Sequence, residues 1–248
     1  MSIPKNLRFI MPDLARLQAQ LGYEFATPGL LERALRHKSV GRDNNEQLEF
    51  LGDAVLGYLV GALLYGAGRA LGEDAMSLMR AHLVRGSALA EHARALDLSR
   101  HLQLGAGERK SGGAQRDSIL ADAFEALVGA IHEDGGIEAC RRFVTARFAP
   151  LIEQLEPDQL KDAKTRLQEW LQGRRYTLPQ YRVEDTSGAD HQRSYSVSCN
   201  VVDLELSVRA TASSRRGAEQ AAAALMLQAL SGEEGFADEV SDSQVVEP

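Results

Sequence analysis

The sequence predicts two domains, an all-α domain followed by a smaller α-β-β-β-α domain. Residues 1–154 show helical hydrophobic periodicity in one segment after another and no strand-like alternation. The stretch 155–161 is polar and contains a proline, as expected of a linker. After it, the hydrophobic period changes to two in three short segments. A chain of 248 residues, 44% of them hydrophobic, is long enough to build both domains without disulfides.

The first domain is predicted to be a succession of helices separated by loops. The segment that starts at residue 46 is apolar nearly all round, which is typical of a helix in the middle of a core. The last segment is expected to start at Asp117 or Ser118 and to end at Gly135-Gly136, since paired glycines terminate helices. The stretch 105–113 has the composition of a loop. The expected helices span residues 14–21, 30–35, 46–65, 76–96 and 117–135.

The second domain, residues 162–232, is predicted to place three strands between two helices. The first helix is expected at 164–173, and an alanine-rich helix at 215–230 has Ser213 and Ser214 as candidate caps. The expected strands span residues 181–184, 194–199 and 204–210. Residues 233–248 are acidic and of mixed composition, so we expect a disordered tail there.

The net charge of −7 is unevenly distributed along the chain. Residues 233–248 carry six acids and no base, whereas residues 161–232 carry a net charge of +2 and residues 1–160 one of −3. Because the acidity is concentrated in the tail, the net charge of the whole chain does not exclude a nucleic-acid partner.

Cysteine content and hydropathy predict a cytoplasmic protein outside the membrane. The two cysteines, Cys140 and Cys199, are too few for a disulfide framework or a thiolate zinc site. The N-terminus has no continuous apolar run of the signal-peptide type, and the longest nearly apolar run, 54–66, is shorter than the roughly 20 residues that a span requires. We expect no organic cofactor. No strand precedes the glycines of residues 52–61, so a phosphate loop is not indicated, and close helix packing explains these glycines better.

Two clusters of carboxylates mark the candidate site. Glu46, Glu49 and Asp53 fall within roughly 80° of one another on a single helix face. Asp122 and Glu125 repeat the pattern, at i and i+3, in the later helix. The residues around both clusters are apolar, and neither helical segment contains a lysine or arginine near its acids.

Two interpretations of these acids are open from spacing alone. Acids at i, i+3 and i+7 are most often a solvated helix face, but here such a face would interrupt an otherwise buried segment. Carboxylates about 4 Å apart repel by roughly 4 kcal/mol at an effective dielectric of 20, so a cluster needs a counter-charge or raised pKa values. Oxygen ligands without His or Cys favour a hard cation, Mg²⁺ or Mn²⁺. The six scattered histidines offer no competing metal pair.

The residues NEQLEFLGDAVL (45–56), GERKSGG (107–113) and SILADAFEALVGAI (118–131) closely resemble the catalytic motifs of bacterial ribonuclease III. The resemblance extends in order and spacing from about residue 21 to 230. It implies an all-α endonuclease domain, a linker and a double-stranded-RNA-binding domain. It also implies a homodimer that hydrolyses duplex RNA with Mg²⁺, Mn²⁺ being able to substitute, and that leaves 5′-phosphate and 3′-hydroxyl ends.

Carried over by position, the resemblance assigns a role to each acid of the candidate site. It implies Asp53 and Glu125 as catalytic residues, and Glu49, Asp122 and Glu125 as metal-binding residues. Glu46, Asp53 and Glu73 are implied as supporting acids, Glu73 reaching the site of the partner subunit. The sequence around Glu73 departs from the family pattern, which leaves Asp74 as an alternative.

The resemblance also implies RNA contacts and a dimer contact. Minor-groove contacts fall on Thr165, Gln168, Glu169 and His191, and phosphate contacts on Arg215 and Arg216. Gly217 stands where the family usually has a third basic residue, so we expect weaker and more salt-sensitive binding. Phe50 and Leu51 fit a dimer contact, with an ordinary core role as the alternative.

Three functions compete at this point. The leading one is a Mg²⁺-dependent endoribonuclease for double-stranded RNA that processes ribosomal RNA precursors and other structured transcripts. The second is a non-catalytic relative that binds duplex RNA, and the third a protein whose acids are structural. The presence of all five acids on the two helices favours the enzyme.

Overall fold

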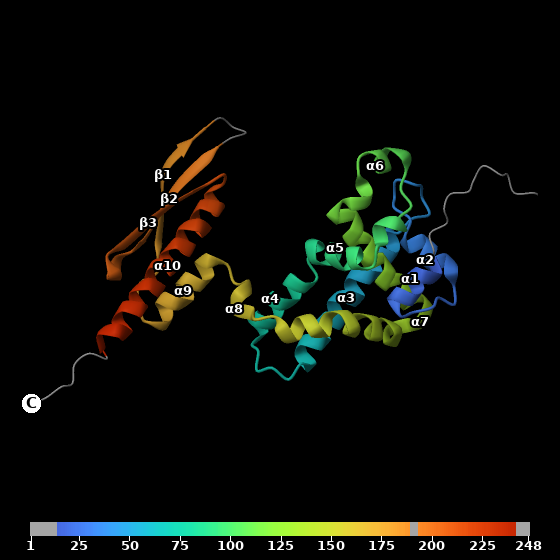
Figure 1. Ribbon diagram of the computed structural model, residues 1–248, viewed down its shortest axis with the longest axis horizontal. Coiled ribbons are helices and arrows are strands. Elements are labelled where there is room, and N and C mark those ends of the chain that lie inside the picture. The colour runs from blue at the N-terminus through green and yellow to red at the C-terminus, as the bar shows by residue number, and fades with distance from the viewer. Residues whose placement is uncertain (1–13, 189–192, 242–248) are drawn as a thin grey trace, which may run out of the picture. The chain divides into compact units, whose positions relative to one another are not determined.

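The computed structural model describes residues 14–188 and 193–241, and the chain folds as two compact units that divide after Pro157 (Figure 1). This division lies inside the stretch 155–161 that the composition indicates as a linker. The linker contains a short helix of its own, α8, at Pro157–Leu160.

The first unit is built from helices around one core. The described part of this unit contains no strand, and its only sheet-like pairing is an isolated bridge between Arg36 and Gln103. The all-α prediction is therefore confirmed. The helices are α1 (Leu14–Leu21), α2 (Pro28–Ala34), α3 (Glu46–Gly66), α4 (Glu73–Leu83), α5 (Gly86–Ala95), α6 (Ala106–Lys110) and α7 (Asp117–Gln154), with short 3₁₀ turns at Leu98–Arg100 and Gly113–Gln115.

Three local expectations differ from the structure. The stretch 76–96 is two helices, because α4 packs against α3 whereas α5 packs against α7. The stretch 105–113 contains helix α6, which an ion pair of 2.8 Å between Glu108 and Arg116 ties to the start of α7. The helix that begins at Asp117 breaks at Gly136, at a positive φ of 71°, but helical structure then resumes as far as Gln154.

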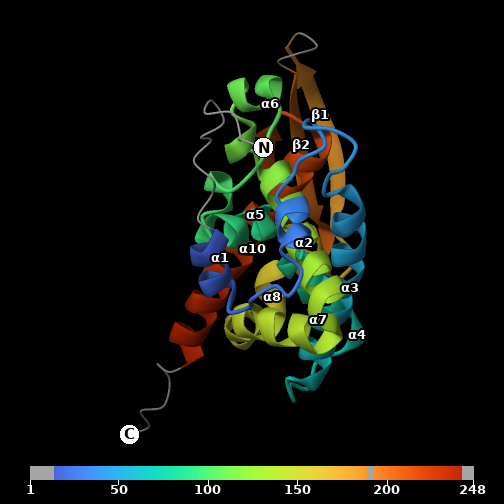
Figure 2. The same cartoon turned by 90° about the vertical axis from the view of Figure 1, so that its right-hand side faces the viewer.

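The most extensive helix packing among the described residues of the first unit is that of α3 and α7, which lie side by side in both views (Figures 1 and 2). A Cβ at Gly52 of α3 would lie 1.8 Å from the carbonyl oxygen of Glu125, and one at Gly129 of α7 would lie 2.1 Å from that of Leu48. The two backbones therefore touch where only glycine fits. The packing role expected of the helix glycines is confirmed for Gly52 but not for Gly57, which has no atom near its missing Cβ.

Helix α3 is long and apolar enough to cross a membrane by length and composition, and it alone passes this test among the described residues. Its charged residues lie near the N-terminal end, so the rest of the helix has a high mean hydropathy. The same helix carries Glu49 and Asp53 and buries Leu48, Gly52 and Val55 against its neighbours. One side of this helix therefore packs within the first unit.

The second unit has the predicted α-β-β-β-α order. Helix α9 (Ala163–Gly173) is followed by strands β1 (Gln180–Ser187), β2 (Ser194–Val201) and β3 (Leu206–Ala212), a 3₁₀ turn at Val202–Leu204 preceding β3, and then by helix α10 (Arg215–Ser241). The sheet is antiparallel in the order β1-β2-β3, with an irregularity between Val183 and Asp185. Helix α10 packs on β2, β3 and α9.

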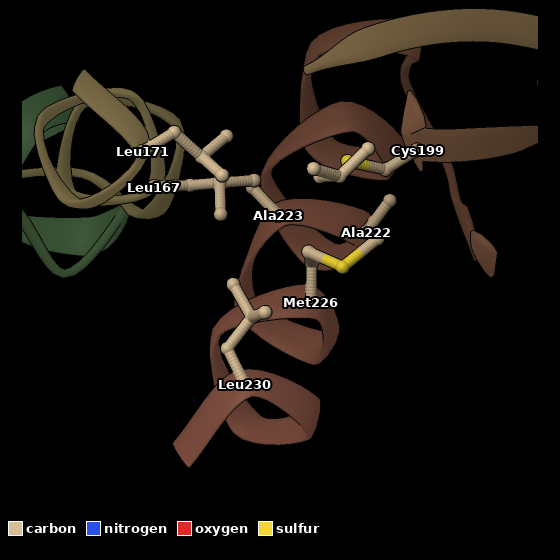
Figure 3. Close-up of a cluster of buried hydrophobic side chains, with 8 residues drawn as sticks. Leu167, Leu171, Cys199, Ala222, Ala223, Met226 and Leu230 are labelled. Atoms are coloured by element: carbon tan, nitrogen blue, oxygen red, sulfur yellow. The ribbon is translucent and has the colours of Figure 1, made fainter. Parts of the chain in front are cut away.

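One apolar cluster holds the helices of the second unit to its sheet (Figure 3). In the close-up, Leu167 and Leu171 of α9 point towards Ala223 of α10, while Cys199 of β2 lies on the other side of that helix. Small alanines on α10 let the helix approach both partners closely. The cluster comprises Leu167, Leu171, Cys199, Val201, Ala222, Ala223, Met226 and Leu230.

Helix α10 continues beyond the expected end at residue 230. It runs to Ser241, into the acidic segment 233–248 for which we expected disorder. No proline interrupts this stretch, and its glutamates and alanine are compatible with a helix that is already formed. Residues 242–248 lie outside the described residues.

The α3–α7 crossing predicts a large effect of one methyl group. Gly52→Ala should lower the free energy of unfolding by about 3 kcal/mol, the upper range for overpacking, since its neighbours are backbone atoms that cannot rotate away. Gly66→Ala on the same helix is the control, because no atom lies within 4 Å of its missing Cβ, and it should change stability by less than about 1 kcal/mol. Urea denaturation of both variants measures this, and equal stabilities would contradict the close crossing.

Candidate active site and RNA-binding surface

Three carboxylates from two helices converge beside the α3–α7 crossing. Glu49 lies one turn before Gly52 on α3, and Glu125 lies one turn before Gly129 on α7, so the close backbone contact brings both side chains together. Asp122, one turn earlier on α7, joins them. Each residue offers a carboxylate oxygen, and the three oxygens lie within 4.8 Å of one another at half-buried positions.

Burial raises the pKa values of all three carboxylates, and neighbouring negative charges add to this at Glu49 and Glu125. Burial is the largest cause of the raised pKa of Glu125, which reaches about 7, and the charges of Asp53, Glu49 and Asp122 add to it. Burial also raises the pKa values of Glu49 and Asp122, the charge of Asp122 contributing at Glu49. The protein thus leaves much of this negative charge without compensation. Several carboxylate oxygens in this state fit a hard divalent cation such as Mg²⁺.

The remaining two acids of α3 lie at the edge of this trio. Asp53 is exposed, yet its charge is the largest Coulombic contribution to the pKa of Glu125. Glu46 is exposed in the first turn of α3, where its carboxylate accepts a hydrogen bond of 3.2 Å from the side chain of Asn44. The five acids therefore form an inner trio and an outer pair.

A lysine that the sequence analysis did not single out provides positive charge at this site. The two acid-bearing helices themselves contain no lysine or arginine near the acids. Lys38 comes instead from the loop between α2 and α3, with its Nζ 3.6 Å from a carboxylate oxygen of Glu46. Its charge lowers the pKa values of Glu49 and Asp122, partly offsetting their increases. A tertiary contact of this kind leaves no signal in helical spacing.

A second feature of the first unit is an exposed aromatic surface on α3. Phe50 is 81% exposed, so it is not a core residue, whereas Leu51 is half-buried. Tyr58 and Tyr65 line a hollow between α3 and α4 that also includes Glu73. Glu73 accepts a hydrogen bond of 2.7 Å from the hydroxyl of Ser77 and does not contribute to the pKa shift of Glu49 or Glu125. It therefore lies outside the acid site of its own chain.

In the second unit, hydrogen bonds and an ion pair tie together the N-termini of α9 and α10. The side chain of Gln220 accepts from the backbone N–H of Lys164 at 3.2 Å, and Glu219 accepts from the Lys164 ammonium at 2.8 Å. The charge of Arg216 contributes to lowering the pKa of Asp162, the residue that caps α9. The start of α10 therefore lies close to the start of α9.

This arrangement brings the predicted RNA contacts of the two helices to neighbouring positions. Thr165, Gln168 and Glu169 are exposed on α9, Glu169 accepting a hydrogen bond of 2.7 Å from Lys161. Arg215 and Arg216 are exposed in the first turn of α10. His191, the remaining predicted contact, lies outside the described residues.

Gly217 occupies the third position of α10, where the hydroxyl of Ser214 accepts a hydrogen bond from its backbone N–H at 3.1 Å. Ser214 is thus the cap, one of the two candidates that the sequence indicated. A Cβ at Gly217 would lie 3.0 Å from that hydroxyl, so a side chain here would press on the cap.

Comparison with known proteins assigns both units. Residues 27–152 match the family model described as ribonuclease-III-like, and residues 163–230 match the double-stranded RNA binding motif. Ribonuclease 3 of Bordetella avium is 48% identical over 218 residues, which is 88% of this chain and 87% of that protein. Ribonuclease 3 of Cupriavidus taiwanensis is 51% identical over 216 residues, covering 87% of this chain and 84% of that protein. The chain belongs to the ribonuclease III family.

Solved structures of ribonuclease III nuclease domains agree with the fold of the first unit. Two structures of the domain from Campylobacter jejuni have TM-scores of 0.53 and 0.52 and sequence identities of 39% and 40%. They cover 55% and 58% of this chain and 99% and 96% of their own. One of them concerns flexibility in a region involved in dimer formation.

The raised pKa of Glu125 predicts how this ribonuclease III responds to pH without metal. A carboxyl whose pKa is raised from 4.5 to about 7 binds its proton more tightly in the folded state, so metal-free stability should fall as pH rises through that window. Glu125→Gln removes this charge. The variant should therefore have a higher thermal midpoint than the wild type in EDTA, with the difference growing from pH 4.5 to pH 7.

The same variant should lose most of the stabilisation that added Mg²⁺ gives the wild type at pH 8, because a metal that binds only the folded state raises its stability. Glu138→Gln is the control, since Glu138 is an exposed residue of α7 paired with Arg141 and outside the acid site. It should keep the wild-type response to Mg²⁺. An undiminished response in Glu125→Gln would show that Glu125 does not bind the metal.

Proposed function

We propose that this ribonuclease III is a divalent-metal-dependent endonuclease that hydrolyses phosphodiester bonds of double-stranded RNA. It leaves 5′-phosphate and 3′-hydroxyl ends with short 3′ overhangs. The observation that carries the proposal is the convergence of Glu49, Asp122 and Glu125 in a chain that also has a double-stranded RNA binding motif.

We assign Mg²⁺, for which Mn²⁺ can substitute, to the inner trio of carboxylates. Glu49, Asp122 and Glu125 would hold the ion, which would supply a water molecule of lowered pKa and positive charge to stabilise the phosphate and the leaving oxygen. Glu125 must release its proton to act as a ligand, since its pKa is about 7 in the metal-free protein.

Asp53 and Glu125 are assigned as the catalytic pair. Among the charges around Glu125, that of Asp53 contributes most to its pKa. Because Asp53 is exposed where the substrate must approach, its carboxylate is available to water and RNA while Glu125 is half-buried. We assign supporting roles to Glu46, at the exposed edge of the trio, and to Glu73, which would act in the site of a partner subunit.

The second unit is proposed to hold the duplex through α9 and the start of α10. Thr165, Gln168 and Glu169 are assigned to the minor groove, where 2′-hydroxyls are displayed. Arg215 and Arg216 are assigned to phosphates, which the N-terminus of a helix also attracts. His191 is assigned to a second minor-groove contact from the loop between β1 and β2.

The protein is proposed to act as a homodimer through the exposed face of α3. A phenylalanine that is 81% exposed, on the same helix as the exposed Tyr58 and Tyr65, is unusual on a monomer surface and typical of an interface. Phe50 and Leu51 are assigned as dimer contacts. A pair of sites could then cut the two strands of one duplex.

The cellular substrates are proposed to be ribosomal RNA precursors and other structured transcripts, including messenger RNA, in the cytoplasm. Duplex segments in these transcripts are the substrate class that the two units together suit. A relative that only binds duplex RNA is the alternative, but it would not require five acids gathered around one half-buried site.

Cleavage of a long labelled duplex RNA tests the proposed function. The wild type should produce short duplexes in Mg²⁺ but not in EDTA, and single-stranded RNA should stay intact. Glu125→Gln should abolish cleavage and retain duplex binding, because the variant lacks a metal ligand and keeps the second unit. Ca²⁺ in place of Mg²⁺ reports whether the site requires the smaller ion. Duplex binding by the wild type without cleavage in Mg²⁺ would favour the non-catalytic relative.

The phosphate contacts predict a uniform loss of RNA affinity. Arg215→Ala combined with Arg216→Ala should weaken binding equally across duplex sequences and should flatten the dependence of log K on log salt by about two units. Arg182→Ala combined with Arg209→Ala removes the same charge from two exposed strand residues and should leave the slope nearly unchanged. Titrations at several salt concentrations measure both. A loss confined to some sequences would contradict the phosphate assignment.

A further inference from the structure

The acid site creates an electrostatic problem for its substrate. Metal ions would offset the inner trio, but Glu46 and Asp53 remain exposed at its edge. If the trio cuts the strand as proposed, the phosphates flanking the cut bond pass close to these two acids. Each of those phosphates carries a negative charge. A cation at the rim would relieve this repulsion and would hold the strand in register.

Lys38 is placed where such a cation is needed. Its Nζ lies 3.6 Å from the carboxylate of Glu46, and its side chain is 61% exposed. The lysine charge also lowers the pKa values of Glu49 on α3 and of Asp122 on α7. It therefore lies at the exposed edge of the acid site, beside the start of α3, and remains accessible from solvent.

The loop around Lys38 is fastened on both sides. The backbone N–H of His37 donates to the carbonyl of Gln103 at 3.1 Å, and that of Asn45 donates to the carbonyl of Arg36 at 2.9 Å. The hydroxyl of Ser39 accepts from the backbone N–H of Gly105 at 2.9 Å. Lys38 thus extends from an anchored backbone, which reduces the entropy lost on binding a ligand.

The existing partner of Lys38 is easily exchanged. Both members of the Lys38–Glu46 pair are more than half exposed, and exposed ion pairs contribute little to stability. A phosphate is a stronger partner for an ammonium group than a solvated carboxylate at this distance, because it can accept a short, charge-assisted hydrogen bond.

We infer that Lys38 binds a backbone phosphate of the RNA strand next to the cut bond, exchanging Glu46 for the substrate. This inference deepens the proposed function and rests on it. It adds a substrate contact in the nuclease unit that is separate from the RNA-binding motif.

The test compares Lys38→Gln, Lys38→Arg and the wild type in steady-state cleavage of a duplex in saturating Mg²⁺ at several salt concentrations. Lys38→Gln should lower kcat/KM about tenfold, as expected for one hydrogen bond to a charged group, and should flatten its salt dependence by about one unit. Lys38→Arg should restore both, since it retains the charge. Arg42→Gln, at an exposed cation of the same loop, is the matched control and should leave both unchanged.

Three results would overturn the inference. In the first, the salt dependence of Lys38→Gln equals that of the wild type. In the second, Lys38→Gln changes only the Mg²⁺ concentration needed for half-maximal activity, which would make Lys38 part of the metal site. In the third, its thermal midpoint falls and Lys38→Arg fails to restore kcat/KM, which would indicate a structural role. Failure of the wild type itself to cut the duplex would instead reject the proposed function.

Discussion

The backbone contact between α3 and α7 is the constraint on which the site depends. Gly52 and Gly129 let the two helices touch where any Cβ would overlap a carbonyl group. Because Glu49 and Glu125 each lie one turn from this contact, the crossing sets the distance between them. A wider separation, as ordinary side chains at the crossing would require, would move the carboxylates apart by a comparable amount. The helix packing therefore also determines the geometry of the carboxylate cluster.

The α3–α7 crossing brings carboxylates together, and their repulsion lowers the stability of the metal-free protein. Burial raises the pKa values of these carboxylates, and the charges of neighbouring acids add to this, most clearly at Glu125. Such a site is less stable without a ligand than a neutral one would be, and this is the usual relation between a prepared active site and stability. The same uncompensated charge is what makes the trio attractive to a divalent ion. The charge of Lys38 offsets part of it at Glu49 and Asp122.

In the second unit, packing and polar contacts together position the starts of α9 and α10. Alanines on α10 allow close packing, while Glu219 and Gln220 of the same helix hold Lys164 at the start of α9. The exposed first turns of the two helices therefore keep a fixed relation to each other. The exposed polar and basic side chains at these positions suit a duplex that is recognised by its shape and phosphate charge rather than by its base sequence.

The sequence by itself determined the order of the elements, the two units, the five acids and the family, because periodicity and motif spacing are local properties of the chain. The tertiary structure alone decided five features. It separated an inner trio from Asp53 and Glu46, it left Phe50 on the surface, and it supplied Lys38 from a loop. It also divided the expected helix 76–96 and extended α10 to Ser241. Each of these features depends on which elements pack against each other. The spacing of residues within one segment does not specify its neighbours in the fold, so the sequence pattern could not predict them.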